Sequence, residues 1–170
     1  SNIATPGSPN SEFTNSEERL SAPEISATGG LFDDEYQFTV NIPSGTTLYY
    51  TEDGSTPVIG KSSISYNGFF SGNETKIYRF MLASNGLINS PVVTRSFIKN
   101  HNDYTLPVLC VNTSPDNFFD DIIGVYVRGT NGRIANNSGT KANQNMDWER
   151  PVNVEFFKKN KDGLYDECFN

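Results

Sequence analysis

The sequence predicts an all-β protein: an antiparallel β-sandwich followed by a smaller, incomplete β-rich segment. The strongest support is the stretch 36–42 (Tyr-Gln-Phe-Thr-Val-Asn-Ile), which alternates strictly between apolar and polar side chains. This period of two is typical of a strand with one face in a core and one in water. Short runs of the same kind recur between turn-forming stretches rich in Gly, Asn and Ser, and no stretch shows a helical period.

The composition is compatible with a thin sandwich core. Hydrophobic residues make up only 35% of the 170 residues, but aromatic residues reach 12%, with 12 Phe and 8 Tyr. The net charge of −7 argues against nucleic acid and anionic membranes as partners, because phosphate groups are bound by basic surfaces. No apolar run approaches the roughly 20 residues that a membrane-spanning helix requires.

The strands of the first half are predicted from their spacing. The turn 43–45 (Pro-Ser-Gly) is expected to lead from the strand at 36–42 into one at 47–51, making the two hairpin neighbours. Further strands are expected at 64–66, 77–83 and 92–98, with turn chemistry between them. Several short strands at this spacing are typical of an immunoglobulin-like sandwich.

The stretch 48–57 (Leu-Tyr-Tyr-Thr-Glu-Asp-Gly-Ser-Thr-Pro) reads as a strand that ends in a tight turn. Leu48 and Tyr50 are expected to face the core, whereas Tyr49 and Thr51 face away from it. The dipeptide Asp-Gly accepts positive φ at a turn. We therefore expect Asp53 to hold this turn through backbone hydrogen bonds, in a structural role.

The second half begins with residues 106–111 (Leu-Pro-Val-Leu-Cys-Val), a continuous apolar run that predicts a strand buried on both faces. Cys110 within it is expected to be a buried free thiol, with a disulfide to Cys168 as the less favoured alternative. A capping Ser114 followed by a proline predicts a single helical turn, and residues 125–127 (Val-Tyr-Val) predict a short strand.

The remaining segment combines a polar loop with a final pair of strands. Residues 129–147 are rich in Asn, Gly, Thr and Ser, and we expect a mobile insertion here, with a binding loop as the alternative. Residues 152–157 and 164–169 are expected to form a hairpin through the charged turn 158–163. Because no closing element follows the final strand, we expect the chain to be truncated within a larger domain.

Four motifs in the first half carry a family resemblance. They are residues 22–25 (Ala-Pro-Glu-Ile), 29–32 (Gly-Gly-Leu-Phe), 49–57 (Tyr-Tyr-Thr-Glu-Asp-Gly-Ser-Thr-Pro) and 90–97 (Ser-Pro-Val-Val-Thr-Arg-Ser-Phe). In this order they resemble the chitobiase/β-hexosaminidase C-terminal-type repeat, an immunoglobulin-like accessory domain of secreted bacterial proteins. The resemblance implies a spacer that is attached to catalytic or surface modules and is not itself catalytic.

Motifs in the second half resemble the opening segment of the spore-coat-protein-H (CotH) kinase-like family. They are residues 106–108, 114–120, 124–127 and 145–157, the last with the run Asp-Trp-Glu-Arg-Pro-Val. The chain departs from the family at 121–123 (Asp-Ile-Ile), where a Pro-x-Thr turn is more usual, and in its long polar loop. In that family the residues assigned to phosphoryl transfer lie downstream of the opening segment, beyond Asn170. Residues 4–10 resemble the end of a lamin-tail domain.

The predicted organisation therefore has four parts. Residues 1–19 are a linker and tag remnant, and residues 20–99 an immunoglobulin-like, chitobiase C-terminal-type domain. Residues 100–105, which include His101, are a linker, and residues 106–170 are the truncated N-terminal part of a CotH kinase-like domain.

No catalytic, cofactor-binding or metal-ligating residue is assigned from the sequence. One histidine and two distant cysteines give no zinc-type ligand set. A calcium site at Asp116, Asp120 and Asp121 is a minor alternative. Sugar binding would use exposed aromatic residues, although these more simply fill thin cores, and Trp148 is expected to pack beneath Arg150. The candidates for sugar stacking are Tyr49, Tyr66, Phe69, Phe70 and Trp148.

These inferences predict a non-catalytic spacer of a larger secreted or cell-surface bacterial protein, with the spore coat as one setting. It would orient a CotH kinase-like domain that continues beyond residue 170. The alternative is a carbohydrate-binding accessory module. We expect a monomer without cofactors whose partners are other domains of the same polypeptide and polysaccharide or cell-surface components, with neither nucleic acid nor membrane among them.

Overall fold

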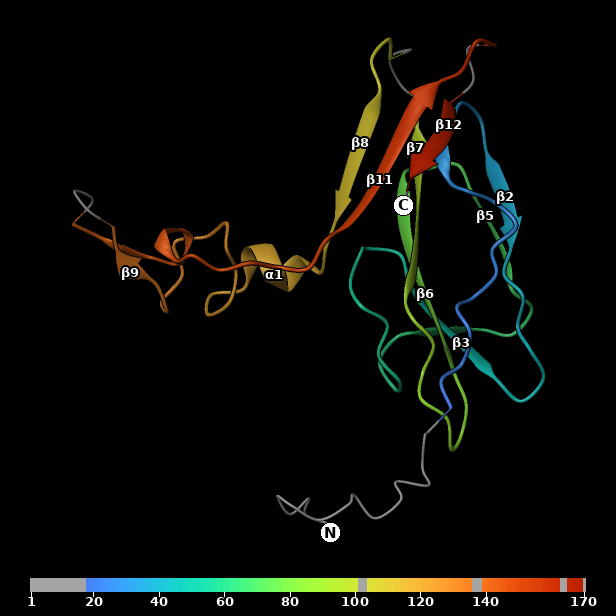
Figure 1. The fold of residues 1–170 in the computed structure, drawn as a ribbon, viewed down its shortest axis with the longest axis horizontal. Coiled ribbons are helices and arrows are strands. Elements are labelled where there is room, and N and C mark those ends of the chain that lie inside the picture. The colour runs from blue at the N-terminus through green and yellow to red at the C-terminus, as the bar shows by residue number, and fades with distance from the viewer. Residues whose placement is uncertain (1–17, 101–103, 136–138, 163–164, 170) are drawn as a thin grey trace, which may run out of the picture.

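The computed structural model describes residues 18–100, 104–135, 139–162 and 165–169, without the side chains of 166–169. The fold is nearly all β, as predicted (Figure 1). The strands are β1 (Gly30–Phe32), β2 (Tyr36–Thr39), β3 (Thr47–Thr51), β4 (Ser63–Ser65), β5 (Phe69–Gly72), β6 (Lys76–Ala83), β7 (Val93–Lys99), β8 (Val108–Asn112), β9 (Arg133–Ile134), β10 (Lys141–Ala142), β11 (Asn153–Lys159) and β12 (Tyr165–Phe169), and the helices are α1 (Pro115–Phe119) and the 3-10 turn η1 (Asn143–Asn145).

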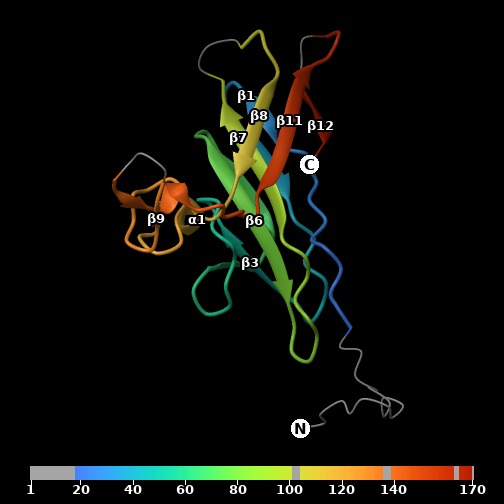
Figure 2. The same cartoon turned by 60° about the vertical axis from the view of Figure 1, so that its left-hand side comes forward.

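The main strands form three layers. The middle layer is a five-stranded sheet in the order β1-β7-β6-β3-β4, and β2 pairs with β5 in a two-stranded sheet across the core from it. A three-stranded sheet, β12-β11-β8, lies beside β7 in both views (Figures 1 and 2). The segment between β8 and β11, here called the side arm (residues 113–152), projects away from these layers with α1 and β9.

The core between the first two layers is mostly aromatic. The ring of Phe97 in β7 stacks on those of Phe38 and Tyr36, with centroid distances of 4.7 and 4.3 Å. Such pairs stabilise a fold by ~0.5–1.5 kcal/mol beyond the burial of their area. The buried members of the core are Tyr36, Phe38, Val40, Leu48, Phe70, Tyr78, Phe80, Leu82 and Phe97.

One hydrogen bond between phenols satisfies the polar atoms inside this core. The hydroxyl groups of Tyr36 and Tyr78 lie 3.1 Å apart, and the Tyr78 side chain is only 1% exposed. Burial, followed by this hydrogen bond, raises the pKa of Tyr78 well above its ordinary value. The phenol of Tyr78 therefore stays neutral, and two aromatic side chains with polar tips are accommodated without an unpaired buried hydroxyl.

The alternation of β7 directs its side chains to two different layers. Phe97 points into the aromatic core, whereas the adjacent Ser96, 1% exposed, contacts Glu155 of β11 on the other side. Next to this contact, a β-carbon on Gly30 would lie 3.7 Å from the ring of Phe157, which is fully buried. The five-stranded sheet is therefore covered on both faces at β1 and β7.

Two details of the predicted strand pairing are wrong. The strands at 36–42 and 47–51 are not hairpin neighbours, because β2 pairs with β5 while β3 pairs with β4 and β6. The turn 43–45 instead carries the chain from one sheet to the other, so that the apolar faces of both strands meet in the core. The sandwich is also not wholly antiparallel, since β1 pairs with β7 in parallel.

The alternation predicted for the first strand and for β3 is confirmed. Tyr36, Phe38 and Val40 are 3–6% exposed, and the intervening polar residues face water. In β3, Leu48 is fully buried, and the ring of Tyr50 lies 4.9 Å from that of Phe70 at the margin of the core.

The strand predicted to be buried on both faces is instead a sheet edge. In β8, Leu109 and Val111 are 58% and 49% exposed, because only the opposite face packs on the sandwich. Cys110 is a free thiol that is half-buried, not fully buried, and burial raises its pKa to about 11, with a further contribution from the charge of Glu155. The Cys168 side chain lies outside the described residues.

Two predictions for the side arm are also corrected. Residues 125–127 form no strand, because the N–H groups of Val125 and Tyr126 donate to the carbonyls of Asn117 and Phe118 in α1. The segment 129–147 is not structureless: β9 and β10 pair within it.

One buried amide contributes to the order of this segment. Asn143 is fully buried, its Oδ1 accepts the N–H of Asn131 at 3.1 Å, and its Nδ2 donates to the carbonyl of Asp121 at 2.9 Å. The helical turn predicted after Ser114 is present, although the serine side chain makes no cap hydrogen bond.

Several sequence predictions fall outside the described residues. These are most of the linker at 1–19, the lamin-tail resemblance at 4–10, and His101 in the second linker. Within the described ranges, no helix is long and apolar enough to cross a membrane.

Truncating Phe70 to alanine should lower the free energy of unfolding by ~3–5 kcal/mol, because the cavity would lie in the aromatic core. Phe69→Ala is the matched control: this neighbouring side chain is 49% exposed, against 6% for Phe70, and should cost less than about 1 kcal/mol. Urea unfolding followed by circular dichroism measures both. Equal costs would contradict this assignment of the two faces of β5.

Candidate functional site

The turn that follows β3 is held by one carboxylate. Oδ1 of Asp53 accepts hydrogen bonds from the hydroxyl of Ser55 at 2.6 Å and from its backbone N–H at 2.9 Å. These bonds, the hydroxyl first, hold the pKa of Asp53 below its usual range. Gly54 between them has a φ of +79°, which glycine adopts without steric penalty. The structural role predicted for Asp53 is confirmed.

Arg79 anchors this turn to the middle sheet. Its Nη1 donates to the carbonyl of Gly54 at 3.1 Å and to the hydroxyl of Thr56 at 3.0 Å. The side chain is half-buried, and burial lowers the pKa of Arg79 from its ordinary value. A β-carbon on Gly54 would lie 3.3 Å from the carbonyl oxygen of Thr113. The turn therefore also touches the segment that follows β8.

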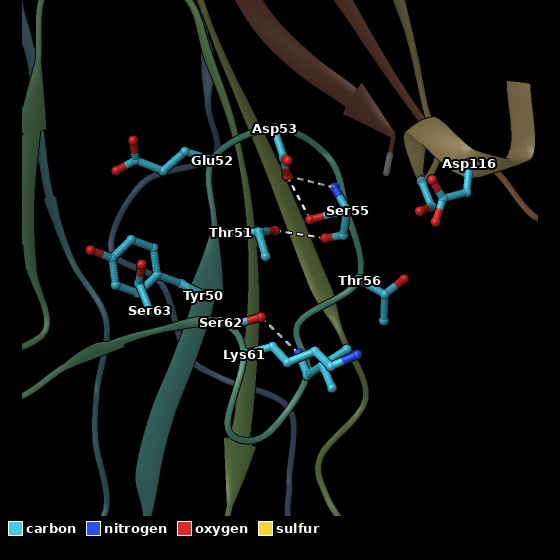
Figure 3. A pocket seen from close by; sticks show the side chains of 12 residues that line it. Tyr50, Thr51, Glu52, Asp53, Ser55, Thr56, Lys61, Ser62, Ser63 and Asp116 are labelled. Atoms are coloured by element: carbon cyan, nitrogen blue, oxygen red, sulfur yellow. Dashed lines mark hydrogen bonds between the residues drawn. The ribbon is translucent and has the colours of Figure 1, made fainter. Parts of the chain in front are cut away.

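A polar cleft of about 810 Å³ lies between this turn and α1 (Figure 3). Figure 3 shows Asp116 of α1 across the cleft from Glu52, whose carboxylate forms an ion pair with Lys76. Such a lining can hydrogen-bond a ligand rich in hydroxyl groups. The lining residues are Tyr50, Thr51, Glu52, Asp53, Ser55, Thr56, Val58, Lys61, Ser62, Ser63, Ser114 and Asp116.

A second, more aromatic groove of about 500 Å³ adjoins this cleft and shares Tyr50 and Glu52 with it. Tyr66 and Phe69 stand at its surface, 90% and 49% exposed. Asn67 lies between them in sequence and accepts the N–H of Phe69 at 3.0 Å, which fixes the turn that carries both rings. The groove offers flat apolar faces next to polar groups.

The five aromatic candidates for sugar stacking are separated by the fold. Only Tyr66 and Phe69 are exposed together at one groove. Phe70 is in the core, and Tyr49 is half-buried on the other face of β3. Trp148 is in the side arm, where the guanidinium of Arg150 lies 5.0 Å from its ring, which confirms the predicted cation–π pair.

The three aspartates of the calcium alternative do not converge. Oδ1 of Asp120 accepts the N–H groups of Ile123 and Ile122 at 2.9 and 2.8 Å, which lowers the pKa of Asp120, and Asp121 accepts the hydroxyl of Thr130. Among the described residues, no group of three or more His, Cys, Asp or Glu side chains could hold a metal ion.

A third site lies between the sandwich and the three-stranded sheet, and we call it the interlayer cluster (Ser96, Asn112 and Glu155). Glu155 is 0% exposed, and its Oε1 accepts the backbone N–H of Ser96 at 3.0 Å. Its Oε2 accepts both the hydroxyl of Ser96 and the amide of Asn112, the latter at 2.9 Å. A buried carboxylate is tolerated when it is hydrogen-bonded in this way.

Sequence reasoning missed the interlayer cluster and Arg79. One signal was available: Glu155 and Phe157 are two residues apart in their strand, so the charged side chain faces the same side as a large apolar one. That pattern indicates either an exposed face or a buried carboxylate with partners. The partners, Ser96 and Asn112, come from two other strands and carry no local signal.

Comparison with known proteins supports the first half of the chain. Residues 39–97, from the end of β2 to β7, match the family model described as "Fn3 associated". This match supports a fibronectin-III- or immunoglobulin-like associated β-domain over that range. No curated protein and no solved structure matches the chain significantly.

Replacing Asp53 should reduce stability in a pH-dependent way. Asp53→Ala removes two hydrogen bonds at the turn and should cost ~1 kcal/mol at neutral pH. Because the pKa of Asp53 is lowered in the folded state, its contribution is complete above the ordinary carboxyl pKa and is lost as the pH falls through the lowered value. Urea midpoints of wild type and variant should therefore converge in acid.

Two control variants separate charge from shape in this experiment. Asp53→Asn keeps an acceptor oxygen for Ser55 and should lose less stability than Asp53→Ala. Glu74→Gln changes an exposed carboxylate and should leave the midpoint unchanged. A constant difference between wild type and Asp53→Ala from neutral to strongly acidic pH would contradict the assigned role.

Proposed function

We propose that this chain is a non-catalytic spacer that holds two β-rich parts of a larger bacterial protein in one fixed orientation. The observation that carries the proposal is the interlayer cluster, in which a buried carboxylate of the second part is hydrogen-bonded by the first. If the two parts slid or rotated against each other while remaining packed together, Glu155 would lose the N–H and hydroxyl of Ser96 while still buried. Leaving a buried charge without its partners costs several kcal/mol, so the cluster disfavours other orientations.

Further contacts support a rigid junction. The ring of Phe157 lies over Gly30, where an added β-carbon would be 3.7 Å from it. At the turn, an added β-carbon on Gly54 would lie 3.3 Å from the carbonyl oxygen of Thr113. In the side arm, Arg150 donates to the carbonyl of Ile123, with its Nε at 3.1 Å, so the chain enters β11 from an anchored position. A flexible tether would need none of these contacts: the first two join the sandwich to the segments packed against it, and the third anchors the chain just before β11.

In this proposal, residues 20–99 are a chitobiase C-terminal-type domain and residues 106–170 the opening segment of a CotH kinase-like domain that continues beyond residue 170. The match of residues 39–97 to the "Fn3 associated" model supports the first assignment at the level of an accessory domain. The second rests on the motif at 145–157, which supplies β11 and the Trp148–Arg150 pair. The chain would act as a monomer, without a cofactor, at the cell surface or in secreted form, with the spore coat as one setting.

A rigid spacer should tumble as one body. Nitrogen-15 relaxation of the wild-type chain should give one rotational correlation time for amides of β6 and β7 and for those of β11. Glu155→Ala should give two correlation times, or a loss of several kcal/mol in the free energy of unfolding, because three buried neutral donors lose their acceptor at ~1–3 kcal/mol each.

Glu149→Ala is the matched control for this experiment, because it removes an exposed glutamate next to the same strand and should change neither quantity. Two distinct correlation times in the wild-type protein would refute the rigid spacer.

Carbohydrate binding is the second candidate function, and the exposure of Tyr66 and Phe69 at one groove favours it. The faces of aromatic rings stack on the apolar faces of sugars, and the hydroxyl-rich cleft adjoins the groove through Tyr50 and Glu52. The cleft is lined by three carboxylates, on Glu52, Asp53 and Asp116, against one lysine in the lining, Lys61, and Glu52 is paired with Lys76. This modest acidic excess would suit neutral polymers better than anionic ones. In that case the spacer would also hold its parent protein against a polysaccharide.

Pull-down with insoluble cellulose and chitin, followed by titration with their soluble oligosaccharides, tests this candidate. Saturable binding should weaken at least about tenfold, or ~1.4 kcal/mol, in Tyr66→Ala. Tyr126→Ala removes a tyrosine of similar exposure from the side arm and should leave affinity unchanged. Absence of binding in the wild type, or an equal loss of affinity in both variants, would refute the carbohydrate-binding role and leave the spacer as the only proposed function.

A further inference from the structure

The interlayer cluster brings together three chemically complementary groups away from water. Ser96 supplies a hydroxyl, Asn112 a primary amide and Glu155 a carboxylate, with exposed fractions of 1%, 7% and 0%. These are the types of group that a nucleophile, an acyl donor and a proton carrier require. They come from β7, β8 and β11, so any bond between the first two would join two layers of the fold.

The arrangement of the three groups suits acyl transfer. The amide nitrogen of Asn112 is 2.8 Å from the hydroxyl oxygen of Ser96 and 2.9 Å from Oε2 of Glu155. The same Oε2 accepts the hydrogen bond of the Ser96 hydroxyl. One carboxylate oxygen therefore contacts both the proton that the serine would lose and the nitrogen that would leave. The N–H of Ser96 on Oε1 keeps the carboxylate in this orientation.

We propose that Ser96 and Asn112 become joined by an intramolecular ester bond. Oγ of Ser96 attacks Cγ of Asn112, and its proton passes to Oε2 of Glu155 and from there to the amide nitrogen. The C–N bond breaks, ammonia leaves, and a C–O bond joins the two side chains. Glu155 ends as the carboxylate that it was at the start, and no oxidant, reductant or second reactant is consumed.

Two physical effects favour this reaction at this place. Folding holds nucleophile, amide and base in contact, which replaces a collision in solution by an intramolecular step with a large effective concentration. Burial also keeps out the water that would hydrolyse an ester, and the released ammonia is lost by dilution. An amide is a poor acyl donor in water, so the step depends on the proton that Glu155 delivers to the leaving nitrogen.

The ester would add a covalent restraint to the contact between β7 and β8. It would close a loop over a sequence separation of 16 residues and so restrict the unfolded chain, as a disulfide does. This inference goes beyond the spacer role, which needs only the hydrogen bonds of the cluster. A failed ester would therefore leave the relaxation experiment and its outcome unaffected.

The intact mass of the purified chain under denaturing conditions tests the proposal. The wild-type mass should be lower than the sequence mass by one ammonia, and Ser96→Ala should restore the full mass. Trypsin cleaves after Arg95, Lys99 and Arg128, so peptide 96–99 should be recovered linked to peptide 100–128. Mild alkali should separate the two peptides. Ser90→Ala, which changes a buried serine outside the cluster, should keep the lower mass.

Glu155→Gln removes the proton carrier, so the measured mass of this variant should equal the mass of its own sequence, without the loss of ammonia. A wild-type chain with the full sequence mass would overturn the proposal. A loss of ammonia that persists in Ser96→Ala would also overturn it, because it would indicate a succinimide, for example at Asn67, Asn85 or Asn131, each followed by glycine. If Ser96→Ala does not fold, the presence or absence of the linked wild-type peptide decides.

Discussion

A single buried carboxylate links the five-stranded sheet to the three-stranded sheet through directional hydrogen bonds. Glu155 is fully buried between the five-stranded and three-stranded sheets, and its two carboxylate oxygens accept hydrogen bonds from Ser96 and Asn112. Hydrophobic contact alone tolerates sliding of one sheet over another, because it is not directional. Hydrogen bonds to a buried charge are directional, and losing them is costly. The cluster therefore adds directional contacts to the apolar packing between the two sheets.

The two faces of the middle sheet make different kinds of contact. The inner face is aromatic and creates the sandwich, through stacked rings such as Phe38 on Phe97. The outer face combines apolar packing with specific polar contacts: Arg79 donates to the turn at Gly54, and Ser96 donates to Glu155 of the next layer. Burial of apolar area gives the fold its stability, whereas the polar contacts of the outer face determine which segments lie beside it. The cleft at α1 follows from these contacts.

Local features of the fold were predictable because they depend on neighbours in sequence. The alternation of residues 36–42 identified a strand and its buried face, and Asp53 next to glycine identified a turn and its hydrogen bonds. The pair Trp148 and Arg150, two residues apart, was predictable for the same reason. Wrong predictions arose where the partner is distant: the run 106–111 looked doubly buried, but one face of β8 has no layer over it among the described residues.

The sequence by itself determined an all-β chain, its accessory-domain resemblance, and the turn at Asp53, because period, turn chemistry and motif order are properties of adjacent residues. Only the tertiary structure decided that β2 pairs with β5, that Tyr66 and Phe69 share a groove, and that Glu155 is buried. The physical reason is that burial and pairing are set by the other layers. A glutamate in a strand can be exposed to water or buried beside hydrogen-bond donors, and only the packing of β7 and β8 next to β11 determines which of the two occurs.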